Sequence, residues 1–466
     1  WDTARKAKIQ AALIATNVPY GEASALEVVR VGDRFADGFL RLRTGACNAH
    51  ERGELETDAY ALEAICFALR KRDLDAIVDR LETADPHIAA HAVDAMSTLI
   101  PVEVCNTREM QQLLVGPPDP TTRQAINHVI GGLHALRAAR ALDDDTVHVA
   151  ALVAQVEKIE APGVRAEVLE LAGAYAAQIA DYKDARVWLT QAADDAATGR
   201  HDLAEASALV NLIVVIGHDL GHREEADALR VRVETAVRRL HDHPEVELAW
   251  LQAEAVLDAG QGDLVAARHK LETAIALADR RYDGTDLRRI APRQTMIDVL
   301  AQHGFAPDTR QYADSILAIA RVILGPDHPG VATALVALGD SLASDDVENA
   351  VKSYEQAAAI AERALDSGGV ADAIAHLAAL QVRRGDLVAS RMLYERAVHL
   401  DEMTRRPAHP ATIAHRSALA ALYDLLDRRA DASKLYARVL ADQRILYDHD
   451  DPRIVETADR VLAAKP

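Results

Sequence analysis

The sequence has few aromatic residues and few helix breakers. Aromatic residues make up 4% of the 466 residues, although 50% of all residues are apolar. A core for so long a chain must then be built from Ala, Leu, Val and Ile, and Ala and Leu are strong helix formers. Only 23 Gly and 16 Pro are present to interrupt the helices. This composition predicts an all-α protein.

Positive charge is also scarce, with 52 Lys and Arg against 72 Asp and Glu, a net charge of -20. Phosphate backbones would be repelled over most of such a surface, so nucleic-acid binding is not expected. No apolar run approaches the roughly 20 residues that cross a bilayer, so membrane insertion by this chain is not expected either. A basic or amphipathic segment of another protein suits the charge better.

Cysteine is limited to Cys47, Cys66 and Cys105, at none of the spacings of a zinc site. The favoured interpretation is three small buried thiols. The alternative is one disulfide with a third thiol left over.

Metal, cofactor and catalytic motifs are also lacking. His87 and His91 could share a helix face after Asp85-Pro86, but no third ligand lies near them in the sequence, so surface positions are favoured. The segment His218-Asp219-Leu220-Gly221-His222 resembles a zinc-peptidase helix, but Asp replaces the Glu base. A solvated turn is the simpler interpretation.

The segment Gly339-Asp340-Ser341-Leu342 spells the nucleophile block of a family of Ser hydrolases. It lies in the middle of an expected helix, and no D-x-x-H element follows it. A Gly-rich loop, H-R-D and D-F-G are also missing, so phosphoryl transfer cannot be assigned. We expect no catalytic residue, no cofactor and no metal, and hence no enzyme in these residues.

Internal repeats are the strongest positive signal. Residues 169–192 contain Ala172-Gly173, then Asp181-Tyr182, and then Ala185, Leu189 and Ala192. Small residues at these places let two helices cross closely, and the large ones fill the gaps. The last small position recurs at Ala192, Val233, Ala274, Ala320, Ala357, Ala397 and Val439, with spacings of 41, 41, 46, 37, 40 and 42. The pattern resembles the tetratricopeptide repeat, with helices longer than those of the plain motif of about 34 residues.

Proline marks the junctions between the later repeats. Gly325-Pro326-Asp327-His328-Pro329, Pro407-Ala408-His409-Pro410 and Asp451-Pro452 each combine a helix stop with a Pro-initiated start. Residues 326–455 therefore resemble the kinesin light-chain type of repeat. We expect a right-handed α-solenoid of about eight helical hairpins, with an N-terminal helical unit and a C-terminal capping helix.

Domain borders are predicted from the same signals. Residues 1–115 form an N-terminal helical unit, with helices at 22–50, 55–70, 73–84, 86–99 and 107–114. Residues 116–122 form a linker, because Gly116-Pro117-Pro118-Asp119-Pro120 disfavours helix. Residues 123–325 carry degenerate repeats, with a turn at Asp143-Asp144-Asp145. Residues 326–466 carry repeats of about 42 residues and the capping helix.

A solenoid of this kind leaves a concave wall lined by the first helix of each hairpin. The repeat frame predicts a peptide-binding groove there, lined by Glu167, Glu170, Asn211, Gln252, Val336, Asp340, Ala375, Val382, Arg383 and Ser417. Asp219, Asp372 and Asp424 are expected at its edge. We call this set of residues the wall.

The first 115 residues carry a second resemblance. Trp1-Asp2, Ala15-Thr16-Asn17-Val18-Pro19-Tyr20, Arg43-Thr44-Gly45-Ala46-Cys47, Cys66-Phe67 and Ala92-Val93 occur in an order similar to the segment between kinase and repeats in Ser/Thr protein kinases of the myxobacterial type. Asn17, in place of Gly, departs from that pattern. The resemblance implies the regulatory or docking arm of a bacterial kinase whose catalytic domain precedes Trp1. The alternative is a free-standing scaffold of a multiprotein assembly. A cytoplasmic protein is expected, or an extracytoplasmic one if a membrane span precedes Trp1.

Overall fold

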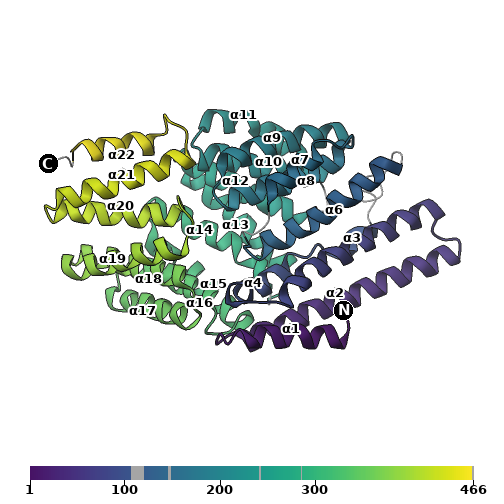
Figure 1. Cartoon of the computed structure of the whole chain (residues 1–466), viewed down its shortest axis with the longest axis horizontal. Coiled ribbons are helices and arrows are strands. Elements are labelled where there is room, and N and C mark those ends of the chain that lie inside the picture. The colour runs from purple at the N-terminus through teal and green to yellow at the C-terminus, as the bar shows by residue number, and fades with distance from the viewer. Residues whose placement is uncertain (107–119, 145–147, 241–242, 285, 464–466) are drawn as a thin grey trace. The chain divides into compact units, whose positions relative to one another are not determined.

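The computed structural model describes residues 1–106, 120–144, 148–240, 243–284 and 286–463 (Figure 1). Helix accounts for 82% of the residues that the structure describes, and these residues contain no strand. The all-α prediction is therefore confirmed. Among these residues, no helix combines the length and apolar character that a membrane crossing requires.

The chain divides into two compact units. Unit 1 comprises Trp1–Tyr175, Val187–Leu209 and Arg238–Leu240, and unit 2 comprises Ala176–Arg186, Val210–Val237 and His241–Pro466. The predicted borders at 115, 122 and 325 stay a prediction. Residues 116–119 of the predicted linker lie outside the described residues, and α6 begins at Pro120.

Unit 1 begins with helices that share few features with the repeats. They are α1 (Thr3–Ala15), α2 (Gly21–Glu51), α3 (Thr57–Leu81), α4 (Pro86–Ser97) and the 3-10 helix η1 (Val102–Asn106). The Asp85 side chain accepts a hydrogen bond from the Ile88 N–H, and Pro86 occupies the first helical position of α4. Two predictions differ from the structure: residues 55–70 and 73–84 join in α3, since no breaker separates them, and α1 was not predicted. The predicted helix 107–114 lies outside the described residues.

A disulfide joins two parts of this region. Cys66 of α3 is bonded to Cys105 of η1, and Cys47 is the free cysteine. The favoured prediction of three thiols was wrong, and the alternative of one disulfide holds. A shared apolar cluster with Ala46 and Phe67 brings the two sulfurs together.

The remaining helices form hairpins. The described residues contain eight pairs: α6 (Pro120–Ala141) with α7 (Val149–Val156), α8 (Pro162–Gln178) with α9 (Tyr182–Gly199), α10 (Asp202–Val214) with α11 (Arg223–Arg239), α12 (Pro244–Gly260) with α13 (Leu264–Arg281), α14 (Ala291–Gln302) with α15 (Arg310–Ile323), α16 (Pro329–Leu342) with α17 (Val347–Arg363), α18 (Ser367–Arg383) with α19 (Leu387–Thr404), and α20 (Pro410–Leu425) with α21 (Arg429–Leu446). Short turns η2 (Val215–Asp219), η3 (Leu287–Arg289) and η4 (Ala306–Thr309) follow α10, α13 and α14. The helix α22 (Pro452–Ala463) packs on α21 and buries Ile454 and Thr457, as the capping helix should.

Burial confirms the repeat frame. The small residues predicted at helix crossings are fully buried: Ala185, Ala192, Val233, Ala274, Ala357, Ala397 and Val439. At Gly173 an added Cβ would lie 2.5 Å from Leu189, and at Gly339 it would lie 2.5 Å from the ring of Tyr354. The first and second helices of these hairpins are therefore in contact at the positions that the sequence marked.

The Gly-Asp pairs of the repeat form the turn between the two helices of a hairpin and the cap of the second helix. Gly262 and Gly385 adopt left-handed φ angles of 88° and 80°, which end the first helix of their hairpins. The next residue, Asp263 or Asp386, caps the second helix by accepting a backbone N–H. In the H-P junctions a histidine side chain is the N-terminal cap of the helix. His328 Nδ1 accepts a hydrogen bond from the Gly330 N–H at 3.0 Å, and His409 Nδ1 accepts one from the Ala411 N–H at 3.2 Å.

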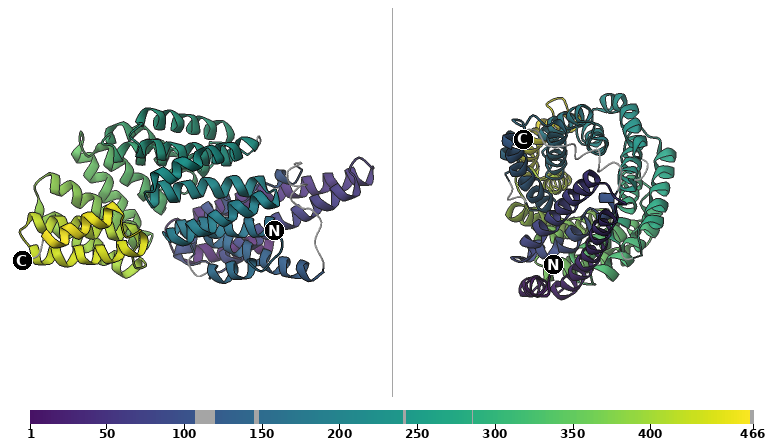
Figure 2. Two further views of the ribbon diagram at one scale, coloured as in Figure 1. Left: turned by 90° about the horizontal axis from the view of Figure 1, so that it is seen from above. Right: turned by 90° about the vertical axis from the view of Figure 1, so that its right-hand side faces the viewer.

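Within unit 2 the hairpins from α16 to α21 stack side by side, and each helix contacts the next (Figure 2). Residues far apart in the chain also meet in this unit. The rings of Tyr182 and Tyr447 are stacked with centroids 6.3 Å apart, and Arg453 donates to the backbone oxygen of Asp219 at 2.7 Å. The start of α22 is thereby tied to a turn 234 residues earlier in the sequence.

Candidate binding surface

The predicted wall residues all lie on the first helices of their hairpins. Glu167 and Glu170 belong to α8, Asn211 to α10, Gln252 to α12, Val336 and Asp340 to α16, Ala375, Val382 and Arg383 to α18, and Ser417 to α20. Glu167 and Glu170 belong to unit 1, and the other wall residues belong to unit 2. The two groups are therefore described separately. Arg383 is exposed and most others are half-buried, but Ala375 is only 4% exposed and lies in the core.

Several polar side chains of the wall are engaged within the protein. Gln252 donates to the Leu248 backbone oxygen at 3.1 Å and accepts from the Thr295 hydroxyl at 3.0 Å. The Ser417 hydroxyl donates to the Ile413 backbone oxygen at 2.8 Å. These groups stiffen the first helices.

Asp340 links two hairpins. Its Oδ1 accepts hydrogen bonds from the Tyr354 hydroxyl of α17 at 2.6 Å and from His376 Nδ1 of α18 at 2.7 Å. Burial lowers the pKa of His376, but the hydrogen bond and negative charge of Asp340 outweigh it, so that the pKa is raised overall. Burial and the same carboxylate raise the pKa of Tyr354. Asp340 therefore favours the protonated form of the His376 imidazole.

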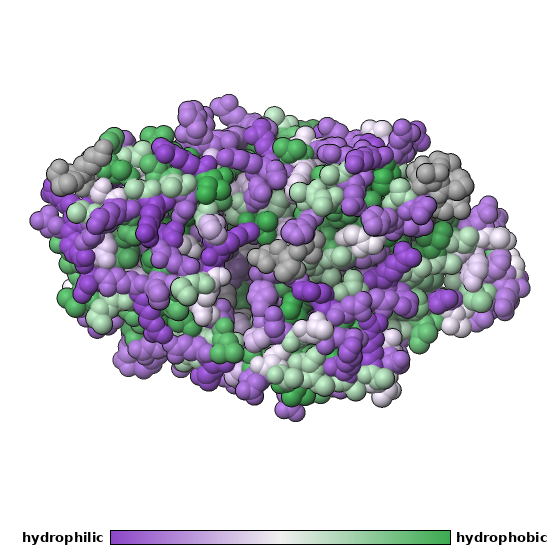
Figure 3. Space-filling model, viewed as in Figure 1, coloured by the Kyte–Doolittle hydropathy of each residue, from purple (hydrophilic) through white to green (hydrophobic). Residues whose placement is uncertain are grey.

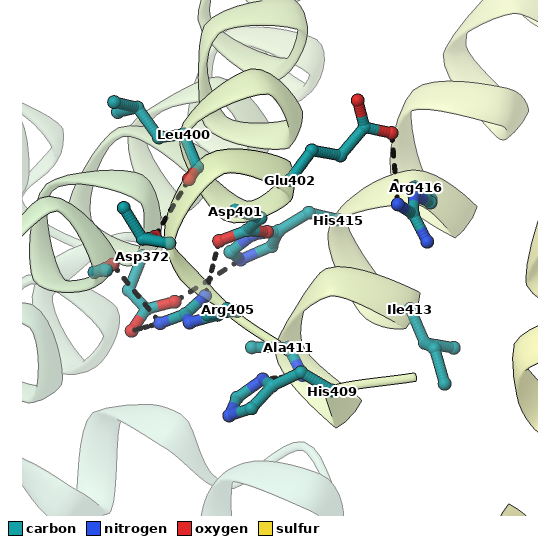
Figure 4. A network of polar contacts seen from close by, with 12 residues as sticks. Asp372, Leu400, Asp401, Glu402, Arg405, His409, Ala411, Ile413, His415 and Arg416 are labelled. Atoms are coloured by element: carbon teal, nitrogen blue, oxygen red, sulfur yellow. Dashed lines mark hydrogen bonds and ion pairs between the residues drawn. The ribbon is translucent and has the colours of Figure 1, made fainter. Parts of the chain in front are cut away.

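A second network joins the next pair of hairpins (Figure 4). Arg405, at the end of α19, donates to Asp372 at 2.7 Å and to the fully buried Asp401 at 2.6 Å. His415 of α20 donates from Nδ1 to Asp401 at 2.8 Å, and its Nε2 lies 3.7 Å from Asp372. Asp372, which was expected at the edge of the groove, is thus paired with a cation.

No local pattern in the sequence marks His376, Arg405 or His415. Each meets a carboxylate from another helix: His376 lies 36 residues after Asp340, and Arg405 lies 33 residues after Asp372. These separations are close to one repeat, and that periodicity is the one signal that could have found the pairs. Charges at equivalent heights on successive first helices are neighbours in a solenoid.

In unit 1 the wall carboxylate Glu167 lies beside a buried charge cluster. Its side chain is 42% exposed, and its Oε1 is 3.7 Å from His201 Nε2. Burial raises the pKa of Glu167, but His201 and the charges of Arg137 and Arg70 outweigh it and lower the pKa to about 2. Glu167 is therefore ionised and is balanced by nearby cations.

The buried carboxylate of that charge cluster is Asp73 of α3, whose side chain is 1% exposed. His134 and Arg137 of α6 donate to its Oδ1 at 2.6 Å and 2.5 Å. Burial raises the pKa of Asp73, but His134, Arg137 and Arg70 outweigh it and lower the pKa to about 2. This group fastens α6 to α3.

A hollow of about 570 Å³ opens in unit 2 beside the turn η2, lined among others by His218, Val256, His303 and Arg453. Asp219 lies beside it, where burial, opposed by the charge of Arg453, raises the pKa of its carboxyl to about 7. Val256 of the first helix α12 borders the hollow.

The structure also places the sequence motifs that imitate catalytic sites. Ser341 lies in α16, is buried, and donates to the Leu338 backbone oxygen at 2.7 Å. Gly339 packs on Tyr354 at the helix crossing, and Asp340 is held as described. In the second motif, His222 lies 3.2 Å from Asp448 while His218 borders the hollow. These residues serve packing and pairing at the positions that the repeat frame assigns.

The surface over α18 to α22, seen on the left of Figure 3, is predominantly polar, with apolar residues scattered among the polar ones. Exposed apolar side chains there include Val388, Met392 and Met403 of α19. Scattered exposure of this kind is ordinary for a protein surface.

Comparison with known proteins identifies the class. A stack of helical hairpins with small residues at the crossings defines an α-solenoid, and residues 289–363 match the tetratricopeptide repeat family. This part of the chain is thus of the tetratricopeptide-repeat type, within an all-helical stack of hairpins. Among curated proteins, none matches the sequence.

Three solved structures are similar to this chain to different extents. A Rap protein complexed with Competence and Sporulation Factor has a TM-score of 0.52 at 12% identity, covering 85% of this chain and 99% of that one. The TPR-like repeats of a kinesin light chain of Podosopora anserina have a TM-score of 0.34 at 23% identity, covering 43% of this chain and 96% of that one. A STAND protein with a tetratricopeptide repeat sensor from Pyrococcus horikoshii has a TM-score of 0.46 at 12% identity, covering 88% of this chain and 60% of that one.

Proposed function

We propose that this chain is a docking module that binds a protein or peptide segment along the first helices of its hairpins. The observation that carries the proposal is the set of partly exposed residues at equivalent places on α12, α16, α18 and α20, held rigid by pairs such as Asp340 with His376. A surface that is ordered before binding loses less entropy when a partner docks. The Rap protein of similar fold is itself complexed with another factor, which is in line with this use of the fold.

The bound segment, on this proposal, is basic or amphipathic. The protein has a net charge of -20, which draws a basic segment towards it at low salt. At the wall itself, however, Asp340 is already paired with His376 and Asp372 with Arg405. Apolar contacts to half-buried Val336 and Val382 must then supply much of the affinity, so an amphipathic segment suits the wall better than a purely basic one.

The position of the contact is tested with two valines six residues apart. A photo-crosslinking amino acid is placed at Val382, on the wall, or at Val388, which is 65% exposed on the second helix of the same hairpin. Both variants are irradiated in the native organism. A partner crosslinked from position 382 and not from 388 supports the wall. The reverse pattern, with both variants folded, refutes it.

We also propose that this module is the regulatory or docking arm of a larger Ser/Thr protein kinase. The support is the ordered series of short motifs in residues 1–115 that resemble the segment between kinase and repeats. The runner-up is a free-standing scaffold. The coding sequence upstream of Trp1 decides between them: an in-frame G-rich loop, H-R-D and D-F-G support the kinase arm, and an in-frame start codon without them supports the scaffold.

The disulfide bears on the compartment. Disulfides persist in oxidising compartments and are rare in the cytosol, so the bond between Cys66 and Cys105 favours the extracytoplasmic alternative over the cytoplasmic one. Alkylation of the denatured protein, taken from cells without reductant, tests this. One modified thiol, at Cys47, is expected. Modification of all three cysteines would indicate that the protein resides in a reducing compartment.

A further inference from the structure

Two histidines of α4 meet an aspartate from a distant loop. His87 and His91 occupy successive turns of the helix, with ring centroids 4.9 Å apart. Asp143, in the loop after α6, lies opposite them. One ligand atom of each residue lies within 4.8 Å of the other two. All three residues belong to unit 1.

The loop that carries Asp143 is fixed by contacts of its neighbour. Asp144 is buried and pairs with Arg80 of α3, its backbone oxygen accepts from the Tyr175 hydroxyl at 3.1 Å, and its N–H donates to the Ala139 oxygen at 2.8 Å. Asp143 itself takes a left-handed φ of 51°, which Asp tolerates better than most residues. His87 Nε2 lies 2.9 Å from the Asp143 backbone oxygen. The fold therefore brings the third side chain to the histidine pair.

We propose that His87, His91 and Asp143 form a binding site for a divalent transition-metal ion of the Zn²⁺ class. Two imidazole nitrogens and a carboxylate oxygen are ligands that Zn²⁺ accepts, and water completes the tetrahedron from the solvent side. Ca²⁺ and Mg²⁺ prefer sites made of oxygen ligands only, so this set discriminates against them.

The site has a structural consequence. The ion joins α4 to the loop after α6, whose residues lie 56 positions away in the sequence. An ion that binds the folded and not the unfolded chain stabilises the folded chain by mass action. None of the three residues belongs to the wall, so binding of the ion and docking of a partner can be tested separately.

The test is zinc binding by the untagged chain with Cys47 replaced by Ser, because a free thiol also binds zinc. Isothermal titration with ZnCl₂ should show one saturable site. His87→Asn and Asp143→Asn should each weaken binding at least about tenfold. His449→Asn, at a fully exposed histidine outside the site, is the matched control and should bind as the parent does.

A second readout is the stability of the folded chain. Zn²⁺ should raise the melting temperature of the parent and of His449→Asn, but not that of His87→Asn, and Mg²⁺ should raise none of them. Co²⁺ bound at the site should give the strong visible absorption of tetrahedral coordination in the parent and in His449→Asn, but not in His87→Asn. Equal zinc affinity in the parent and the folded His87→Asn and Asp143→Asn variants would overturn the proposal, as would the absence of a saturable site.

Discussion

At the scale of single residues, two helical glycines show how the surroundings of a residue set the sign of a substitution's effect on stability. Gly339 of α16 lies against the ring of Tyr354, and a Cβ there would approach the ring to 2.5 Å. Gly45 of α2 has nothing within 4 Å of the place where a Cβ would be. Both lie inside helices, where Ala is intrinsically preferred over Gly by up to about 1 kcal/mol.

We therefore expect opposite signs for the same exchange. Gly339→Ala should destabilise the protein by about 1–3 kcal/mol, because the buried ring cannot retreat from the new methyl group. Gly45→Ala should stabilise it by up to about 1 kcal/mol. Urea unfolding followed by circular dichroism measures both. A neutral or stabilising Gly339→Ala would contradict the close crossing of α16 and α17.

Asp73 provides a second prediction at this scale. Its pKa is lowered to about 2 from a usual value of 3.8. A carboxyl whose pKa is depressed on folding contributes stability above the unfolded pKa, and this stability is lost as the pH falls through the folded pKa. The shift corresponds to about 2 kcal/mol at neutral pH, lost between about pH 5 and pH 2.

Asp73→Asn should accordingly lower the free energy of unfolding by about 2 kcal/mol or more at pH 7, since Arg70 and Arg137 lose their counter-charge. The difference from the parent should shrink as the pH is lowered from 5 towards 2. Asp58→Asn, in the exposed first turn of the same helix α3, is the control and should have a small effect at every pH. A pH-independent effect of Asp73→Asn would show that its charge is not what matters.

At the scale of the element, the crossing of helices within a hairpin limits the size of the side chain. Ala397 of α19 is fully buried at such a crossing, next to Tyr394 on the same helix, while Val388 of α19 is exposed. A hairpin packed in this way responds to added volume at the crossing but not on its outer face.

Ala397→Leu should cost about 1–3 kcal/mol by overpacking, whereas Val388→Leu should change stability by less than about 0.5 kcal/mol. Melting temperatures of the two variants, which place Leu at two positions of the same helix, make the comparison. A melting temperature of Ala397→Leu at or above that of the parent would show that the repeat frame is misassigned by at least one residue.

At the scale of the whole chain, the question is how the N-terminal helices relate to the repeats. The sequence proposes a linker at 116–122, yet α6, which follows it, is fastened to α3 by the buried pairs of Asp73 with His134 and Arg137. A cut in the linker therefore need not separate the two pieces. Cys66 and Cys105 both precede the linker, so the disulfide would not hold them together.

Limited proteolysis should give a C-terminal fragment that begins between about residues 110 and 125 and remains stable. The two fragments should co-elute in gel filtration at neutral pH and appear separately on a denaturing gel with or without reductant. Cleavage elsewhere, with this stretch protected, would contradict the proposed linker. Co-elution lost in Asp73→Asn would show that the buried pairs join the fragments.

The sequence by itself determined the helical class, the hairpin frame and the first helices that form the wall. These properties follow from helix propensity, from small residues at fixed spacing and from capping residues, all of which act within one or two turns of the chain. Ala397 and Gly339 could therefore be placed at crossings in advance.

Only the tertiary structure decided which charges and sulfurs meet. Asp340 finds His376, Cys66 finds Cys105 and the histidines of α4 find Asp143, across separations of 36, 39 and 56 residues. Such pairs depend on how helices are rotated and stacked, and a local pattern does not contain that information. For the same reason the sequence predicted that the carboxylates of the wall are available to a partner. In the folded chain Asp340 is paired with His376, and Asp372 is paired with Arg405.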